Sequence, residues 1–432
     1  MSEGVTMKTK PYLKIWFVAI IMFFSVVDSA QSAYECTEDV SHLQTSGSIY
    51  RICMPTDVEY NGKLVIWAHG FQDATDLVSI PEDQLSFGNF SIPAVITSLG
   101  YAFATNSYSK TGLAVIQGSE DIIELVELFT IFNNRTPPEK VFLTGASEGG
   151  LITTLLMETS DLFDAGFAAC GPIGDFPYQI KYFGDARATF QYFFPHLIPG
   201  APFNPSDRLV ANWEAYYESV VKPVVFSPRK RSKLDQWVNV ANLPFDSNNK
   251  YTSLELTVKD VLRYSVVNIN DAAETIGGFP FENRWTWYRG SKNDFFLNLL
   301  VPRISAAPVA IAEMKANYNT SGRLDRPLVT MHTLYDQQVP YFHEFLYNLK
   351  TLANGSLLTE HINIPINRFG HCNFAPEEAL LGFGLMLLYA GELDTLEGVG
   401  TLLQGDQLNS FENYSDQFGL PYSKEGEKLT VK

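Results

Sequence analysis

The residues of this chain that could perform chemistry are a serine, an aspartate and a histidine, in that order. Ser147 is the centre of a G-x-S-x-G pentapeptide, and Asp336 and His371 each follow an apolar run further along the chain. A serine hydroxyl becomes a nucleophile when an imidazole accepts its proton, and a carboxylate holds that imidazole in the required tautomer. The residue types and their order therefore predict acyl transfer by a triad of Ser147, Asp336 and His371.

The residues around Ser147 favour a sharp strand-to-helix turn. Residues 141–144 are β-branched and aromatic, as in a buried strand, and an apolar, helix-compatible run follows the pentapeptide. Gly145 and Gly149 flank the serine, where a Cβ would collide in such a turn. A chance match to this pentapeptide is expected in a chain this long roughly one time in seven, so the prediction depends on the partner residues.

Two other aspartates are alternatives for the acid. Asp325 precedes the strand expected at 326–333 and should therefore lie at the wrong end of the sheet. Asp175 follows the strand expected at 163–169 and is the stronger rival. Asp336 is preferred because it comes just past its strand, as His371 does after the strand expected at 362–366.

A second short motif predicts the groups that stabilise negative charge. The run at 63–68 has the composition of a strand, and His69, Gly70 and Phe71 follow it directly. In a turn of this kind, the N–H of Phe71 and the N–H of Glu148 would donate to a developing oxyanion. For His69 we favour a structural role, bracing the loop by hydrogen bonds, over a catalytic one.

The rest of the chain alternates strand-like and helix-like runs, with one long interruption. The expected strands are 48–54, 63–68, 101–107, 141–144, 163–169, 326–333 and 362–366, and the expected helices of the same rhythm are 92–99, 119–132 and 375–389. Such alternation predicts an α/β class with a mostly parallel central sheet flanked by helices. Its core would comprise residues 34–174 and 326–432.

Residues 175–325 break the rhythm and predict a large, mainly helical cap insertion. The segment is rich in aromatic residues, and helices are expected at 206–221 and 254–266. A cap over the carboxyl ends of the strands would wall an apolar pocket. Most of its rings should fill the cap's own core, and Trp285 and Trp287 are predicted to bind substrate.

The first 33 residues have the pattern of a signal peptide. Lys8, Lys10 and Lys14 precede an apolar run at 15–27, and small residues at 29–33 suit cleavage. The apolar run is shorter than the about 20 residues of a membrane span. We expect a secreted protein, extracellular or periplasmic, with no stable membrane insertion.

Four cysteines in an exported chain predict two disulfides. Cys36 and Cys53 are the favoured pair because they lie close in the sequence, which leaves Cys170 and Cys372. Free buried thiols are the alternative. The spacings match no zinc or haem motif, and we expect neither metal nor cofactor.

The formal net charge of −17 at pH 7 argues against nucleic acid and anionic membranes as partners. A small-molecule or polymer ester is the expected partner, and the sequence leaves the oligomeric state open.

Several local stretches resemble the α/β-hydrolase superfamily. They are GASEGG, PFENRWTWYRGSKND, YNTSGRLDRPLVTMHT, YDQQVPYFHE and RFGHCNF. Within the superfamily, the chain is similar to secreted bacterial serine hydrolases and esterases with a long aromatic cap. The resemblance implies the α/β-hydrolase fold and a hydrolase, and it does not imply a substrate.

A carboxylic-ester hydrolase is the first functional hypothesis, because the aromatic cap favours an acyl or aryl group over a charged one. A serine peptidase of prolyl-oligopeptidase type is the second, although no repeat or propeller-sized N-terminal domain accompanies it. An acyltransferase using the same triad is the third. A non-catalytic binding protein on a hydrolase fold is the alternative from a different class.

Overall fold

A single eight-stranded sheet organises the residues that the computed structural model describes, which are 34–37, 43–200, 203–357, 359–420 and 422. The strand order is β1-β2-β6-β3-β7-β8-β9-β10. Only β2 runs against its neighbours in this sheet, and the other pairings from β6 to β10 are parallel. The strands are β1 (Tyr34–Cys36), β2 (Tyr50–Pro55), β3 (Leu64–Ala68), β6 (Ala102–Asn106), β7 (Val141–Ala146), β8 (Ala165–Ala169), β9 (Leu328–Tyr335) and β10 (His361–Phe369).

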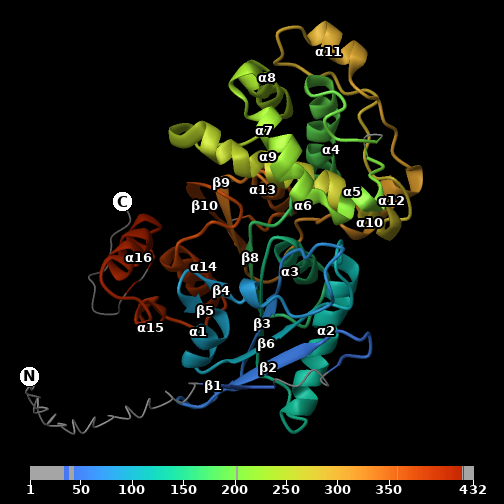
Figure 1. Cartoon of the computed structure of the whole chain (residues 1–432). Coiled ribbons are helices and arrows are strands. Elements are labelled where there is room, and N and C mark those ends of the chain that lie inside the picture. Colours follow the sequence, from blue (N-terminus) through green and yellow to red (C-terminus); the bar gives the residue numbers. More distant parts are fainter. Residues whose placement is uncertain (1–33, 38–42, 201–202, 358, 421, 423–432) are drawn as a thin grey trace, which may run out of the picture. The chain divides into compact units, whose positions relative to one another are not determined.

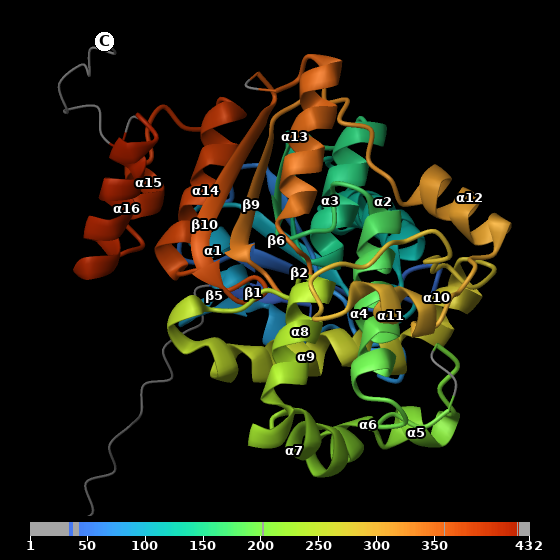
Figure 2. The same ribbon diagram turned by 90° about the horizontal axis from the view of Figure 1, so that it is seen from above.

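Helices cover both faces of this sheet (Figure 2). One face packs against α2 (Val115–Phe132), α3 (Glu148–Thr159) and α13 (Phe342–Asn354). The other packs against α1 (Ile92–Ser98), α14 (Pro376–Tyr389), α15 (Glu397–Gly400) and α16 (Asp406–Gln417). The central strands are buried on both sides and accordingly read as nearly continuous apolar or small residues. This is the α/β-hydrolase fold, and the fold prediction is confirmed.

A long inserted segment connects β8 to β9 and lies beyond the carboxyl ends of the strands in Figure 1. Its helices pack around their own apolar core, in which Phe190, Trp237 and Leu262 are fully buried. They are α4 (Phe176–Phe193), α5 (Asp207–Ala211), α6 (Trp213–Tyr216), α7 (Lys222–Val225), α8 (Arg231–Ala241), α9 (Lys250–Val267), α10 (Ile269–Thr275), α11 (Asp294–Leu300) and α12 (Pro308–Asn317).

The short connections carry the smaller elements. A 3-10 turn (Glu82–Gln84) precedes a hairpin of β4 (Ser86–Phe87) and β5 (Phe90–Ser91). Among the described residues, no helix combines the length and the apolar character needed to cross a bilayer. The expected signal peptide lies outside the described residues.

Three of the expected helices differ from the observed ones by more than one residue. The helix expected over 254–266 is α9, which begins at Lys250 and ends at Val267. The helix expected to begin at 119 begins at Val115 and includes Gly118. This glycine does not mark a turn; it allows close packing, because a Cβ there would come within 2.8 Å of the Ile152 side chain. The helix expected over 206–221 is divided into α5, α6 and a π-helical turn (Tyr217–Val221).

Both expected disulfides are present. Cys36 and Cys53 face each other across β1 and β2, with their Cα atoms 4.0 Å apart. Cys170 at the end of β8 is bonded to Cys372, with Cα atoms 5.4 Å apart. The alternative of free buried thiols is therefore wrong.

Candidate active site

The backbone at Ser147 has a conformation that residues other than glycine rarely adopt. Ser147 has φ 57° and ψ −119° between the end of β7 and the start of α3. A Cβ on Gly145 would overlap the carbonyl of Gly149, and one on Gly149 would overlap the carbonyl of Ala68. The backbone N–H of Ser147 donates to the carbonyl of Ala169 at 2.8 Å. The two glycines therefore allow the close approach that this strained turn requires.

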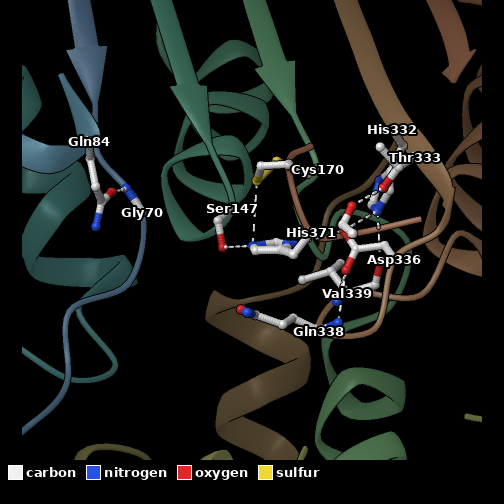
Figure 3. The surroundings of a disulfide bond; sticks show 12 residues. Gly70, Gln84, Ser147, Cys170, His332, Thr333, Asp336, Gln338, Val339 and His371 are labelled. Atoms are coloured by element: carbon white, nitrogen blue, oxygen red, sulfur yellow. Dashed lines mark hydrogen bonds and ion pairs between the residues drawn. A yellow bond between two sulfur atoms is a disulfide. The ribbon is translucent and has the colours of Figure 1, made fainter. Parts of the chain in front are cut away.

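Three side chains from separate strand ends form one hydrogen-bonded line (Figure 3). The Ser147 Oγ lies 2.8 Å from Nε2 of His371, and Nδ1 of His371 lies 2.7 Å from Oδ2 of Asp336. Asp336 follows β9 and is fully buried, and His371 follows β10. The structure thus brings together the three residues that the sequence singled out.

The other carboxylate oxygen of Asp336 is held by the backbone. Oδ1 accepts the N–H groups of Gln338 at 2.8 Å and Val339 at 2.9 Å. Burial opposes ionisation of this carboxyl, but the charges and hydrogen bonds of His371 and His332 hold the pKa of Asp336 well below its usual range. Asp336 is therefore an anion in a fixed orientation.

The two rival aspartates lie elsewhere. Asp175 caps α4, where its side chain accepts the N–H of Tyr178 at 3.1 Å. Asp325 is exposed before the start of β9. Among the described residues, the carboxylate hydrogen-bonded to His371 is that of Asp336.

A second histidine, which the sequence analysis missed, lies behind the acid. Nε2 of the fully buried His332 is 2.8 Å from the carbonyl of Val339 and 3.3 Å from Oδ2 of Asp336, and Nδ1 is 3.3 Å from Oε1 of Glu344. All of these partners are acceptors, so both ring nitrogens must carry protons. Although burial lowers it, the pKa of His332 is raised to about 10 by Asp336 and Glu344.

We predict that His332→Gln lowers kcat about 10–100-fold with little change in KM, because a neutral amide cannot support Asp336 as a cation does. Stability gives a second readout. The pKa of His332 lies above the ~6.5 of an unfolded histidine, so its contribution is complete below about pH 6.5 and is lost as the pH rises towards about 10. Chemical denaturation should show that the free energy of unfolding of the wild type declines across this pH range. In His332→Gln this decline should be smaller. An unchanged kcat and an unchanged pH profile would contradict the prediction.

The predicted oxyanion donors lie on the two sides of Ser147. Among the described residues, no acceptor is hydrogen-bonded to the N–H of Phe71 or of Glu148. A Cβ on Gly70 would lie 3.2 Å from the Cβ of Ser147, which shows how closely the 69–71 loop approaches the serine. Both N–H groups remain available to a ligand at Ser147.

Gln84 holds this loop and was also missed from the sequence. Its Oε1 accepts the N–H of Gly70 at 2.7 Å (Figure 3). Its Nε2 donates to the carbonyl of Phe71 at 3.4 Å. His69 braces the same loop from inside, with Nδ1 2.7 Å from the carbonyl of Gly70 and its ring stacked on Tyr108. Burial lowers the pKa of His69 to about 4, so the ring is neutral.

The side chain of Glu148 is buried next to the nucleophile. Its Oε1 accepts the N–H of Ala114 at 2.9 Å, which fixes the start of α2. Burial raises the pKa of Glu148 to about 8, outweighing the hydrogen bond from Ala114 and the charge of Lys110. Near neutral pH this carboxyl is mostly uncharged, so it does not repel negative charge that develops at Ser147.

Two apolar cavities meet at Ser147. The larger, of about 320 Å³, also reaches His371 and runs between the sheet, α1 and α14; its apolar walls include Trp67, Phe87, Ile92, Phe167, Phe374 and Phe383. The smaller, of about 100 Å³, lies under the inserted segment, whose Phe176, Ile180, Phe183, Phe203 and Tyr264 line it. The site can therefore hold apolar groups on two sides of a bond attacked by Ser147.

The prediction for Trp285 and Trp287 is not supported by their positions. Their side chains are 83% and 56% exposed, and neither residue lines the cavities at Ser147. The buried ring of this loop is instead Tyr288, whose hydroxyl donates to Asp185 at 2.7 Å and accepts from Asn283 at 2.9 Å. Tyr288 therefore pairs its polar end inside the segment, whereas the two tryptophans are exposed.

The second disulfide lies directly beside His371. Sγ of Cys372 is 3.5 Å from Nε2 of His371, and the bond to Cys170 ties this loop to the end of β8. Among the described residues, Cys170, His371 and Cys372 are the one group of potential metal ligands whose ligand atoms lie close together. Both of their sulfurs are already joined in the disulfide.

We predict that Cys170→Ala/Cys372→Ala lowers kcat more than Cys36→Ala/Cys53→Ala does. Both changes should cost roughly 2–5 kcal/mol of stability. Only the first frees the loop that positions His371, because Cys36 and Cys53 join β1 to β2 at the sheet edge. Turnover should be measured well below both melting temperatures. Equal losses of kcat in the two double variants would show that the Cys170–Cys372 bond has no positioning role.

No protein-family model and no curated protein matches the sequence. Solved structures with a similar fold include an acylaminoacyl peptidase from Pyrococcus horikoshii, 12% identical over 84% of this chain and 41% of the peptidase, with a TM-score of 0.39. Lipase A of Candida antarctica is 15% identical over 84% of this chain and 75% of the lipase, with a TM-score of 0.41. An esterase from Aspergillus oryzae is 13% identical over 76% and 71% of the two chains, with a TM-score of 0.44. The chain spans less than half the length of the peptidase, and similarity at this level concerns the fold alone.

Proposed function

We propose that this chain is a secreted serine hydrolase that cleaves carboxylic esters through an acyl-enzyme on Ser147. The observation that carries the proposal is the hydrogen-bonded line of Ser147, His371 and Asp336 at the junction of two apolar cavities. Residues 1–33 would be removed as a signal peptide, and the two disulfides suit an oxidising compartment. In this proposal residues 175–325 form the cap over a core of residues 34–174 and 326–432.

In the proposed reaction, His371 Nε2 takes the proton of the Ser147 hydroxyl as Oγ attacks the ester carbonyl. The N–H groups of Phe71 and Glu148 donate to the oxyanion, and the anionic Asp336 stabilises the imidazolium. His371 then returns the proton to the leaving alcohol, which breaks the ester bond and leaves the acyl group on Ser147. Water, deprotonated by the same imidazole, releases the acid.

A panel of p-nitrophenyl esters and aminoacyl-naphthylamides, measured on the purified protein, tests this function. Ester turnover with weak amide turnover is the expected result. Faster cleavage of the amides would favour the peptidase hypothesis. A lack of both activities, together with no labelling of Ser147 by a fluorophosphonate, would favour a binding protein on a hydrolase fold.

We predict that Ala379→Phe narrows substrate choice, because Ala379 lines the larger cavity from α14 and a phenyl ring would occupy its space. The kcat/KM of a p-nitrophenyl octanoate should fall roughly 10-fold or more, as expected for a lost apolar contact of this size, while that of the acetate stays within about 2-fold. Trp285→Ala is the matched control and should leave both esters unaffected. Equal losses on the two esters in Ala379→Phe would place the acyl group elsewhere.

A further inference from the structure

An unusual concentration of exposed apolar side chains lies on the outer part of the inserted segment. Within 17 consecutive residues, 284–300, six large apolar side chains are exposed by half or more. We call these six the outer apolar patch: Trp285, Trp287, Phe295, Phe296, Leu299 and Leu300. In Figure 1, α11, which carries four of them, lies beyond α4 and α8 as seen from the sheet.

The helix α11 turns its apolar face outward. Phe295 and Leu299 are one turn apart, as are Phe296 and Leu300, so the two pairs occupy adjacent rows on one side of the helix. The opposite side, with Leu297 and the polar Asn298, is the buried one. A surface helix normally buries its broader apolar face, and this arrangement is the reverse.

Hydrogen bonds join the tryptophan loop to α11. The Arg303 guanidinium donates to the carbonyls of Asn283, Thr286 and Asn298 at 2.6–2.9 Å. Asn298 also exchanges two hydrogen bonds with the backbone of Tyr288, at 2.8 and 2.7 Å. Thr286 and Tyr288 flank Trp287, so this network holds the loop that carries the tryptophans to α11.

The surroundings of the patch differ in charge from the rest of the chain. Between residues 282 and 300 there are three cations, Arg284, Arg289 and Lys292, and two acids, Glu282 and Asp294, in a chain of net charge −17. Glu282 lies 3.7 Å from the Arg284 guanidinium. Asp294 is engaged within its own turn, where it accepts from the N–H and the hydroxyl of Ser291. Local positive charge beside aromatic rings suits the level of lipid headgroups, where phosphates meet the apolar layer.

The patch is separate from the cavities at the site. None of its six residues lines the two cavities at Ser147 or the polar one beside Asp260 and Arg263. Protein interfaces concentrate binding energy where anchors enter pockets, whereas a lipid surface needs only a face of rings and aliphatic groups. The overall charge of −17 would repel a strongly anionic surface.

We propose that the outer apolar patch docks this protein on a zwitterionic lipid surface, without insertion across it. The rings and leucines would enter the headgroup boundary, and Arg284, Arg289 and Lys292 would lie near the phosphates. Docking does not require Ser147, so Ser147→Ala should bind as wild type does, and the proposal can fail independently of the proposed hydrolysis.

The test is co-sedimentation of the purified protein with phosphatidylcholine vesicles. Phe296→Ser/Leu300→Ser should weaken partitioning into the vesicles by roughly 10-fold or more, because two apolar side chains that the lipid would bury are lost. Turnover of a soluble acetate ester should be unchanged. Tryptophan emission should shift to shorter wavelength when wild type binds, because Trp285 and Trp287 leave water. The double variant keeps both tryptophans and should not show the shift.

Ile131→Ser/Phe132→Ser on α2 is the matched control, since these two adjacent apolar residues are also exposed. It should bind vesicles as wild type does. The proposal is overturned if wild type stays in the supernatant, or if the control loses as much binding as the patch variant. Binding that requires added phosphatidylserine and disappears at high salt would also overturn it. So would a dimer that the patch variant abolishes in the absence of any vesicle binding.

Discussion

Replacing Ser147 with alanine should abolish ester hydrolysis, with kcat falling by roughly 10⁴-fold or more. The hydroxyl is the group that forms the acyl-enzyme, and no other hydroxyl is hydrogen-bonded to His371 among the described residues. Any remaining rate would come from the N–H groups of Phe71 and Glu148 and from the apolar cavities, which the substitution leaves in place. The measurement is kcat/KM on a short p-nitrophenyl ester.

The variant should fold normally, which separates lost chemistry from lost structure. Alanine retains the Cβ, and the backbone N–H of residue 147 still donates to the carbonyl of Ala169. Thermal unfolding close to that of wild type is therefore expected. Labelling by a fluorophosphonate, detected as a mass increase on the peptide with Ser147, should be lost in the variant. Activity within tenfold of wild type would remove Ser147 as the nucleophile.

The parts of the site set by local backbone geometry could be predicted from the sequence. A side chain at Gly145 would collide with the carbonyl of Gly149, and one at Gly149 would collide with the carbonyl of Ala68 on the neighbouring strand. The pentapeptide itself shows that both positions must be glycine. Asp336 and His371 follow β9 and β10 directly, and parallel strands bring their carboxyl ends to one edge. A strand pattern followed by the right residue type was therefore sufficient to place them.

The parts set by long-range contacts could not be predicted in this way. Gln84 reaches Gly70 from the 3-10 turn before β4, and nothing in the local sequence marks a glutamine as a loop clamp. His332 is the second case, since it lies within an apolar strand where a histidine is indistinguishable from a core residue. Its position four residues before Asp336 was the available signal.

Trp285 and Trp287 show why aromatic content alone was misleading. A ring-rich segment predicts apolar walls, but which rings face inward depends on the polar partners available. Tyr288 finds Asp185 and Asn283 inside the segment, whereas Trp285 and Trp287 are exposed. The rings of the inserted segment that do line the smaller cavity include Phe176 and Phe183 of α4 and Tyr264 of α9.

The second large effect is expected for Asp336→Asn, with kcat falling about 10⁴-fold. The structure fixes how the new amide would lie. Oδ1 of Asp336 accepts the N–H groups of Gln338 and Val339, so the amide oxygen must take this place. The NH₂ group then replaces Oδ2, 2.7 Å from Nδ1 of His371.

An NH₂ group at that position donates to Nδ1 and forces the proton of the imidazole onto Nε2. Nε2 then faces the Ser147 hydroxyl as a donor and cannot accept its proton, so attack on the carbonyl fails although all three side chains remain in place. Asp175→Asn is the matched control, because asparagine caps a helix as well as aspartate does and α4 should be unaffected. We expect its kcat to match wild type. A small effect for Asp336→Asn together with a large one for Asp175→Asn would assign the acid to Asp175, and the hydrogen bond between Asp336 and His371 would then be structural only.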